Sequence, residues 1–355
     1  TRALGPEFPA AFRGVDELIL TPVYAASEPP LLGGSAWDLY EHFRQAEKRG
    51  RGPMASVAGS LGQAWEYLRR QLRKGDVMMV IGAGDVEQIA LQAKQEFGAG
   101  NRRSFHRRLT VPASVAAGVR YGEPLAGRTT LRVGGPAEAF VEIRTASALS
   151  RLLRWTHREK IPFRILGAGS NLLVSDLGVP GVVARLAGGE FAGLRAGAAG
   201  EGADLVAGAG VPLARLLAHA EQNGLAGLEF LEGIPGSAGG AVRMNAGAHG
   251  DDIGSHISWI HCLNPDGSAC ILRSSDLGFS YRCCDGLDDR VVMAVGLQVS
   301  PGRPSEIRNL RRALAGRRKW MHGLRSAGSI FKNPDGDFAG RLIERAGLKE
   351  RAIGG

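Results

Sequence analysis

Two short stretches of the sequence place polar side chains where they could do chemistry. Near the end of the chain, "SAGSIFKNP" sets Ser329 behind a glycine and ahead of two apolar residues, with Lys332 and Asn333 following. The Ser329 hydroxyl could hand a proton to a bound reactant, or it could be a turn serine. In "FSYR", Arg282 follows Tyr281 and could hold an anion, or it could be a surface arginine that caps a strand. Asn333 precedes a proline and could be a turn former, and Lys332 could be a solvated lysine.

A glycine loop further upstream offers donors for a phosphorylated cofactor. "GAGSNLLV" combines Gly167 and Gly169 with the Ser170 hydroxyl and the Asn171 amide. Consecutive backbone N–H groups and two polar side chains within one short loop suit a pyrophosphate. Leu172 stands where a dinucleotide fingerprint would have its third glycine, so a Rossmann fingerprint is not completed and a structural turn is the alternative.

A second glycine-rich segment, "IPGSAGGAVRMNAGAHG", repeats this composition. Its glycines would let the backbone approach a ligand closely, and an asparagine adds an amide. We expect the two loops to hold one cofactor from two sides. The candidate cofactor residues of the second loop are Gly236, Ser237, Gly239, Gly240, Asn245 and Gly247.

The first hundred residues alternate predicted strands and helices, which is typical of a mostly parallel sheet. Apolar runs predict strands at 16–26 and 77–84. Amphipathic spacing predicts helices at 36–50, 62–76 and 85–97. Residues 99–117 are basic and irregular, which favours a linker over a surface loop.

From residue 121 onward, short strands are separated by glycine turns. The pattern predicts strand–turn–strand units at 129–143 and 163–175, and a helix at 146–160. It further predicts a strand end followed by a helix at 207–225, and a hairpin at 258–273 that turns at Pro-Asp-Gly. These elements must position the glycine loops, Arg282 and Ser329.

Composition sets broad limits on function. The chain has 355 residues, 52 of them glycine, and a formal charge of +9. Only "RRSFHRR" is densely basic and no nucleic-acid-binding motif accompanies it, so a basic surface or an anionic small substrate explains the charge more simply than nucleic acid. The four cysteines form no CxxC pair, which disfavours zinc and suits free thiols in a reducing cytoplasm. No apolar run reaches membrane-spanning length, and no signal peptide is recognised.

Five motifs, in order, carry a resemblance to a known family. They are "LRVGGPAEAF", "ILGAGSNLLVSD", "GLEFLEGIPGSAGGAVRMNAGAHG", "FSYR" and "SAGSIFKNPDGDFAGRLIERAGL". Residues 118–355 thereby resemble the UDP-N-acetylenolpyruvoylglucosamine reductases, flavoenzymes of peptidoglycan synthesis. The resemblance implies an FAD-binding domain of the vanillyl-alcohol-oxidase type, a separate α+β substrate domain, and NADPH as co-substrate.

The resemblance also implies roles for the residues of the first paragraph. Ser329 matches the proton donor, and Arg282 matches the arginine that stabilises the carboxylate and enolate of the substrate. Asn333 matches a substrate-binding amide, and Tyr281 is expected to shape the position of Arg282. The family's third catalytic group, a C-terminal glutamate, would lie beyond Gly355, so we expect cofactor binding to be more secure than turnover.

The N-terminal part resembles a different family. "EFPAAFRGVDELILTPVYAASEPPLLG" and "KGDVMMVIGAGDV" are similar to the Rossmann-like C-terminal domain of UDP-N-acetylmuramate–L-alanine ligases, without the ATP-binding loop. We therefore expect a fusion without ligase activity, in which both ends are incomplete. The expected domains are a partial ligase domain at 1–98, a linker at 99–117, an FAD-binding domain at 118–305 and a truncated substrate domain at 306–355.

Three hypotheses follow for the function. The first is NADPH-dependent, FAD-mediated reduction of UDP-N-acetylglucosamine enolpyruvate to UDP-N-acetylmuramate in the cytoplasm. The second is another oxidoreductase on the same FAD fold, such as a small-molecule oxidase, for which Ser329 and Arg282 have no evident use. The third is a chain that binds FAD without turnover, which the absent glutamate favours.

Overall fold

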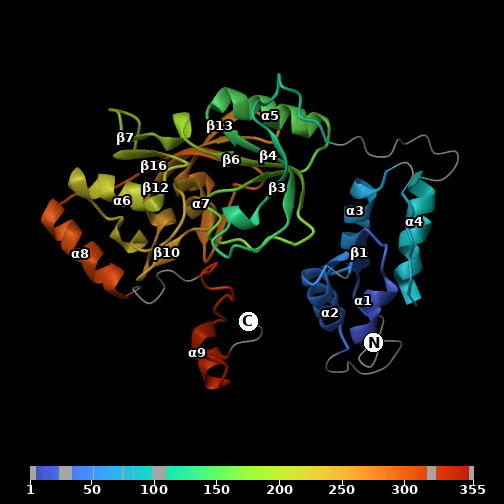
Figure 1. The fold of residues 1–355 in the computed structure, drawn as a ribbon. Helices are drawn as coiled ribbons and strands as arrows, with labels where there is room; N and C mark the ends of the chain where they lie inside the picture. Colours follow the sequence, from blue (N-terminus) through green and yellow to red (C-terminus); the bar gives the residue numbers. More distant parts are fainter. Residues whose placement is uncertain are drawn as a thin grey trace.

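The computed structural model describes residues 5–23, 34–50, 52–73, 76–82, 84–97, 109–317 and 325–351. Figure 1 shows the elements of residues 5–97 gathered in one lobe and those of residues 120–317 in a larger body. The segment after residue 325 extends from the larger body (Figure 1). Among the helices of the described ranges, none combines the length and hydropathy of a bilayer-spanning segment.

The N-terminal lobe is built on a parallel strand pair. β1 (Glu17–Leu20) pairs with β2 (Met54–Val57), and Trp65 and Ile89 are buried in a small core that also includes Leu177 of the larger body. α2 (Ala36–Lys48) begins at Ser35 with a reciprocal capping box, as the amphipathic pattern predicts. The other elements are η1 (Gly5–Glu7), α1 (Phe8–Ala11), α3 (Leu61–Gln71), η2 (Gly84–Val86) and α4 (Glu87–Phe97).

The strand predicted at 77–84 is wrong over its described part. Residues 76–82 form no strand, although their side chains alternate. Val77 and Met79 are 90% and 75% exposed, whereas Met78 and Val80 pack against the lobe's core. The alternation buries one face, but within the described residues the β1–β2 pair does not extend to a third strand. Residues 24–26 and 74–75 of the neighbouring predictions lie outside the described residues.

Two sheets form the larger body. The first has the order β3-β4-β6-β5, in which β4–β6 and β5–β6 are parallel and β3–β4 is antiparallel. The second is antiparallel and has the order β13-β12-β16-β8-β7. Their strands are β3 (Arg120–Pro124), β4 (Pro136–Ile143), β5 (Phe163–Ile165), β6 (Val179–Leu186), β7 (Leu194–Ala196), β8 (Leu205–Gly208), β12 (Ile257–Leu263), β13 (Ala269–Arg273) and β16 (Val291–Leu297).

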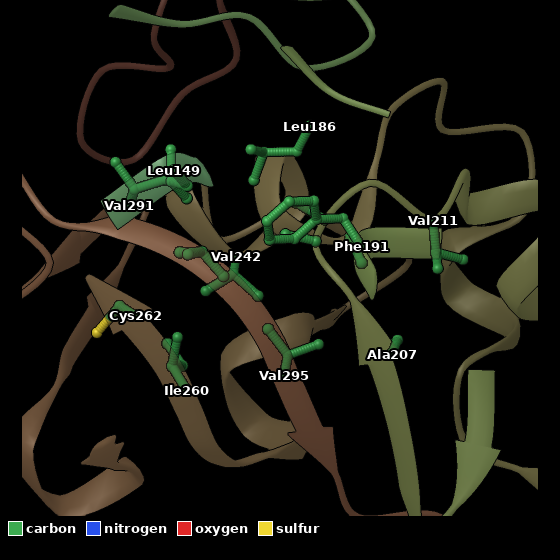
Figure 2. Close-up of a cluster of buried hydrophobic side chains, with 14 of the residues drawn as sticks. Leu149, Leu186, Phe191, Ala207, Val211, Val242, Ile260, Cys262, Val291 and Val295 are labelled. Carbon is green, nitrogen blue, oxygen red and sulfur yellow. The ribbon is translucent and has the colours of Figure 1, made fainter. Parts of the chain in front are cut away.

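Helices and short hairpins complete this body. α5 (Ala146–Arg158) and α6 (Leu213–Gln222) confirm the predicted helices and bury their leucines in the main core. Figure 2 shows this core, where Phe191, Val211 and Val295 come together from different elements. The remaining elements are η3 (Ala126–Arg128), η4 (Gly189–Ala192), β9 (Leu225–Ala226), η5 (Glu229–Leu231), α7 (Ala238–Arg243), β10 (Gly247–Ala248), β11 (Asp251–Asp252), η6 (Ile253–His256), η7 (Ser274–Asp276), β14 (Gly278–Ser280), β15 (Cys283–Asp285), β17 (Ser300–Pro301) and α8 (Pro304–Arg317).

The structure corrects two predicted strands in the body and revises the linker. Residues 129–135 are irregular, because the chain turns there through the bond from the Arg132 N–H to the Thr129 oxygen. Residues 171–175 are irregular and lead into the turn that the Gly178 N–H and the Ser175 oxygen close. Of the predicted linker, 99–108 lies outside the described residues. Val111 and Ala116 from its second half are buried against the main core, so this half is docked rather than free. The hairpin predicted at 258–273 is confirmed by β12 and β13.

The last described segment is open to solvent. α9 (Ala339–Arg345) has no buried residue, and Ile330, Phe331 and Phe338 are 77%, 63% and 68% exposed. α8, by contrast, is held to the body, because Arg311 binds Glu221 of α6 and Glu232 at 2.6 Å each. The boundary expected at residue 305 therefore falls at the start of a helix that packs on the body.

Candidate functional site

The loop after β5 presents unbonded backbone donors. Within the described residues, the N–H groups of 167–171 donate to no protein acceptor. Gly169 has φ +69, and a Cβ there would lie 2.1 Å from the carbonyl oxygen of Arg128, so only glycine fits. The Thr130 N–H donates to the Gly169 oxygen at 3.1 Å and fixes the turn from outside. A short loop with free N–H groups is an anion-binding shape.

The second glycine loop lies directly against the first. The Ser170 hydroxyl donates to the Pro235 oxygen at 2.7 Å and joins the two loops. Ser237 then begins α7, and its side chain accepts from Gly240 N at 3.4 Å as the helix N-cap. A helix thus follows this loop, which the sequence did not indicate. The expectation that both loops grip one ligand agrees with their adjacency.

The N-terminus of α7 has less to offer a ligand than its sequence implies. Ala238 N and Gly239 N donate to the Val211 and Ala209 oxygens at 2.8 and 2.9 Å. These two N–H groups are therefore already bonded within the protein and are not available to a ligand. The N–H groups that remain without a protein acceptor, among the described residues of this loop, are those of Gly236 and Ser237.

The glycines of the second loop fall into two groups. A Cβ at Gly239 would lie 2.8 Å from the Ala209 Cβ, and one at Gly247 would lie 2.7 Å from the Asp251 oxygen. Packing alone requires glycine there. At Gly236 and Gly240 the nearest atoms are side-chain atoms at 3.6 and 3.4 Å, so the protein itself would accept a larger residue. Glycine at these two positions fits the approach of a ligand.

Asn245 is engaged by the protein itself. Its side chain is buried, its Nδ2 donates to the Ser280 oxygen at 3.1 Å, and its Oδ1 accepts from Gly254 N at 3.0 Å. Its φ of +40 is a left-handed conformation that asparagine tolerates. Both amide atoms have partners, which gives Asn245 a positional role, and its second amide N–H is left for the predicted ligand contact. The bond to Ser280 ties the end of α7 to the strand that leads to Arg282.

Arg282 lies at the turn between β14 and β15. Its φ is +58, a left-handed conformation that is uncommon for a long side chain, and such outliers cluster at functional sites. Its guanidinium carbon lies 5.3 Å from the centre of the Tyr281 ring, and Tyr281 is 53% exposed. The two side chains therefore stand together at the surface.

The segment that carries Ser329 is attached to the first glycine loop. The Thr130 hydroxyl donates to the Ser326 oxygen at 2.6 Å and also lies 3.4 Å from the Gly169 oxygen. Ser329 itself is exposed. Asn333 Oδ1 accepts from Ala339 N at 3.0 Å, so half of its amide is used to hold α9. Thr130 could not be identified as a site residue from the sequence, because a single threonine belongs to no recognisable motif.

Lys332, on the Ser329 segment, acts electrostatically on the residue that follows Arg282. The hydrogen bond to Asp285 raises the pKa of the Cys283 thiol, and the charge of Lys332 acts on the same thiol in the opposite direction. Lys332 is three residues after Ser329, and Cys283 directly follows Arg282. One electrostatic interaction thus links the two predicted catalytic segments. In the described part of the chain, no cluster of His, Cys, Asp and Glu could hold a metal ion.

Comparison with known proteins assigns the family. The FAD binding domain family matches residues 137–273, and the C-terminal domain family of UDP-N-acetylenolpyruvoylglucosamine reductase matches residues 320–355. A reductase of that name from Symbiobacterium thermophilum is 41% identical over 66% of this chain and 76% of its own length. One from an Anaeromyxobacter species is 43% identical over 65% of this chain and 72% of its own length. The chain belongs to the UDP-N-acetylenolpyruvoylglucosamine reductase family.

A solved structure agrees with this assignment. UDP-N-acetylenolpyruvylglucosamine reductase from Thermus caldophilus superposes with a TM-score of 0.58 at 37% identity, over 66% of this chain and 82% of that chain. The body of this reductase-family chain is thus a mixed α/β FAD-binding domain of the vanillyl-alcohol-oxidase type. Its cofactor is FAD, and the family match includes both glycine loops. The unbonded N–H groups of 167–171 and the open positions Gly236 and Gly240 fit its pyrophosphate.

Proposed function

We propose that this chain reduces the enolpyruvyl ether of UDP-N-acetylglucosamine to UDP-N-acetylmuramate, with NADPH as electron source. The observation that carries the proposal is Thr130, whose hydroxyl bonds Ser326 while its N–H bonds Gly169. It thereby ties the segment of the candidate proton donor to the candidate pyrophosphate loop. Bound FAD supplies hydride to the enolpyruvyl group.

We propose that Arg282 and Ser329 act on the charge that hydride addition creates. Hydride addition to the methylene carbon leaves an enolate next to the substrate carboxylate. The fork of the Arg282 guanidinium suits two oxygens of such a group and stabilises it. The Ser329 hydroxyl gives its proton to the carbon that bears the carboxylate, and Asn333 holds the substrate through its free amide N–H groups. Tyr281 keeps the Arg282 side chain in place through their stacking contact.

Substrate-dependent NADPH oxidation tests the activity. We expect a yellow protein whose NADPH oxidation requires the enolpyruvyl substrate and proceeds without oxygen. NADPH oxidation that consumes oxygen, and that the enolpyruvyl substrate does not accelerate, would instead favour the oxidase hypothesis. A colourless protein that FAD cannot reconstitute would remove the basis of the proposal.

We further propose that residues 1–98 are a partial ligase C-terminal domain and that the reductase part begins after the linker. The parallel β1–β2 pair between helices supports a Rossmann-like unit, and the family matches at 137–273 and 320–355 lie outside it. On this proposal the FAD-binding domain spans 118–305 and the substrate domain begins at 306. An assay for ADP release from ATP with UDP-N-acetylmuramate and L-alanine should show no ligase activity.

We also propose a cytoplasmic location. The four cysteines are free thiols, which suits a reducing compartment.

A further inference from the structure

Two cysteines face each other across the β12–β13 hairpin. Cys262 and Cys270 are directly opposite in the antiparallel register, and their Sγ atoms are 3.3 Å apart. β13 is the outer strand of its sheet. Cys262 is fully buried, on the same strand as Ile260 (Figure 2), whereas Cys270 is half-buried. The pair therefore has one thiol inside the main core and one half-buried thiol packed against that core.

We propose that Cys262 and Cys270 form an oxidisable dithiol that a hydroperoxide closes to a cross-strand disulfide. Opposite residues of an antiparallel pair have Cβ atoms about 4.5–5.5 Å apart. A disulfide needs about 3.5–4.5 Å between Cβ atoms, so a small movement of the outer strand is enough. Because β13 has a neighbour on one side, it can make this movement at lower cost than a central strand.

The chemistry assigns different roles to the two thiols. Cys270 is the less buried of the two, and its sulfur attacks the peroxide, which gives a sulfenic acid and releases an alcohol or water. Cys262 then attacks the Cys270 sulfur. The S–S bond forms, the S–O bond breaks, and the Cys262 proton leaves with the hydroxide as water. Two thiols are oxidised and one peroxide is reduced, so no further reactant is needed.

The surroundings agree with these roles. Burial, and then the hydrogen bond with Cys270, raise the pKa of Cys262 to about 12, so Cys262 waits as a thiol. The Cys270 thiol lies 3.6 Å from Asn264 Oδ1, which also accepts from Arg290 Nε at 2.9 Å. The shared acceptor fixes the Asn264 amide beside the Cys270 sulfur.

The chain contains its own control pair. Cys283 and Cys284 are neighbours on β15, so their side chains point to opposite faces of the strand. Cys284 belongs to the main core, and the Cys283 thiol donates to Asp285 Oδ1 at 3.2 Å. Proximity in sequence thus gives no disulfide here, whereas Cys262 and Cys270, eight residues apart, are in contact.

Peptide mapping tests the proposal on the FAD-loaded full chain. The reduced protein is treated with stoichiometric hydrogen peroxide and then alkylated with N-ethylmaleimide in denaturant. Cleavage before aspartates separates the two cysteines at Asp266. We expect the peptide with Cys262 and the peptide with Cys270 to remain linked until dithiothreitol is added, while the peptide with Cys283 and Cys284 carries two alkyl groups.

Two variants sharpen the result. Cys270→Ser lies on the outer strand and should abolish the linkage, and Cys283→Ser should leave it unchanged. The proposal is overturned if Cys262 and Cys270 of the peroxide-treated protein are both alkylated. It is equally overturned if Cys270 ends as sulfinic acid while Cys262 stays alkylated, or if the linkage joins Cys270 to Cys283.

Discussion

The two sides of the candidate site are built differently. The glycine loops after β5 and before α7 hold each other through Ser170 and Pro235, and they lie on the main core. The Ser329 segment is exposed and is held to the first loop by Thr130. The cofactor side, formed by the glycine loops, is thus part of the folded body. The proton-donor side, formed by the Ser329 segment, contacts that body through few residues. The two sides should therefore respond separately to mutation.

Replacement of Ser329 should give the largest loss of activity, and only the half-reaction with the substrate should be affected. Ser329→Ala is expected to slow reoxidation of the reduced flavin by the substrate by about 10²–10⁴-fold, because it removes the proton donor. Flavin content and flavin reduction by NADPH should stay unchanged. Stopped-flow absorbance of both half-reactions measures this, with Ser305→Ala, an exposed serine of α8, as the control. Equal slowing of both half-reactions would break the separation of the two sides.

Replacement of Arg282 should also act on the substrate side. Arg282→Lys keeps the charge but loses the two-pronged geometry, and we expect a loss of about 10²–10³-fold in kcat/KM for the enolpyruvyl substrate. Arg303→Lys is the matched control, since Arg303 is an exposed arginine that pairs with Glu306. Retention of full kcat/KM in Arg282→Lys would assign Arg282 to the surface.

Asn245 connects the two sides, so its replacement should lower both the stability of the protein and the rate of the substrate half-reaction. Asn245→Ala leaves the Gly254 N–H and the Ser280 carbonyl without their partner, which costs about 1–3 kcal/mol of unfolding free energy. Thermal unfolding measures this, and the substrate half-reaction should slow because the strand leading to Arg282 is released. Asn223→Ala, at an exposed helix end, is the control. A variant with normal stability and lost flavin would show that Asn245 contacts the cofactor after all.

Gly236 tests the cofactor side by itself. Gly236→Ala should fit the apoprotein, because the nearest atoms to the new Cβ are at 3.6 Å, yet it should obstruct the ligand. We expect about a tenfold weaker FAD affinity, which corresponds to about 1.4 kcal/mol, and an unchanged apoprotein melting temperature. Fluorescence titration with FAD measures it. Gly316→Ala in α8, where a Cβ would meet nothing within 4 Å, should alter neither. Unaltered affinity in Gly236→Ala would move the pyrophosphate away from this loop.

The smallest effect is expected at the contact that joins the two sides. Thr130→Val keeps the shape and removes the bond to Ser326, which is worth about 0.5–1.5 kcal/mol. We expect a severalfold rise in KM for the enolpyruvyl substrate at constant flavin content. The neighbouring Thr129→Val is the matched control, since its hydroxyl bonds within its own loop to Val133. A normal KM in Thr130→Val would mean that other contacts position the segment.

Much of the fold could be predicted where local signals suffice. The helices α2 and α5 have amphipathic spacing and N-cap residues at Ser35 and Thr145, so their limits follow from the chain itself. The hairpin of β12 and β13 could be predicted because Pro265, Asp266 and Gly267 are typical turn residues. The strands expected at 129–133 and over the described part of 77–84 are absent, because an apolar pattern shows that side chains are buried and not that a partner strand is available.

The candidate site was predicted in part for a related reason. The glycine loops and the residues around Arg282 and Ser329 are recognisable as motifs. Motifs do not say which way an amide points, and Asn245 has partners on both amide atoms that only the folded chain brings near. Thr130 could not be predicted, because its role depends on a carbonyl 196 residues away.

That separation also bears on the order of folding. Closing a chain over such a distance costs entropy that local contacts do not repay, so the Thr130–Ser326 contact should form after the body has condensed. The ability to bind flavin should then return early in refolding, and substrate reduction only once the last segment docks. A newly made chain would pass through a coloured but inactive state, in which the cofactor is in place before the acid arrives.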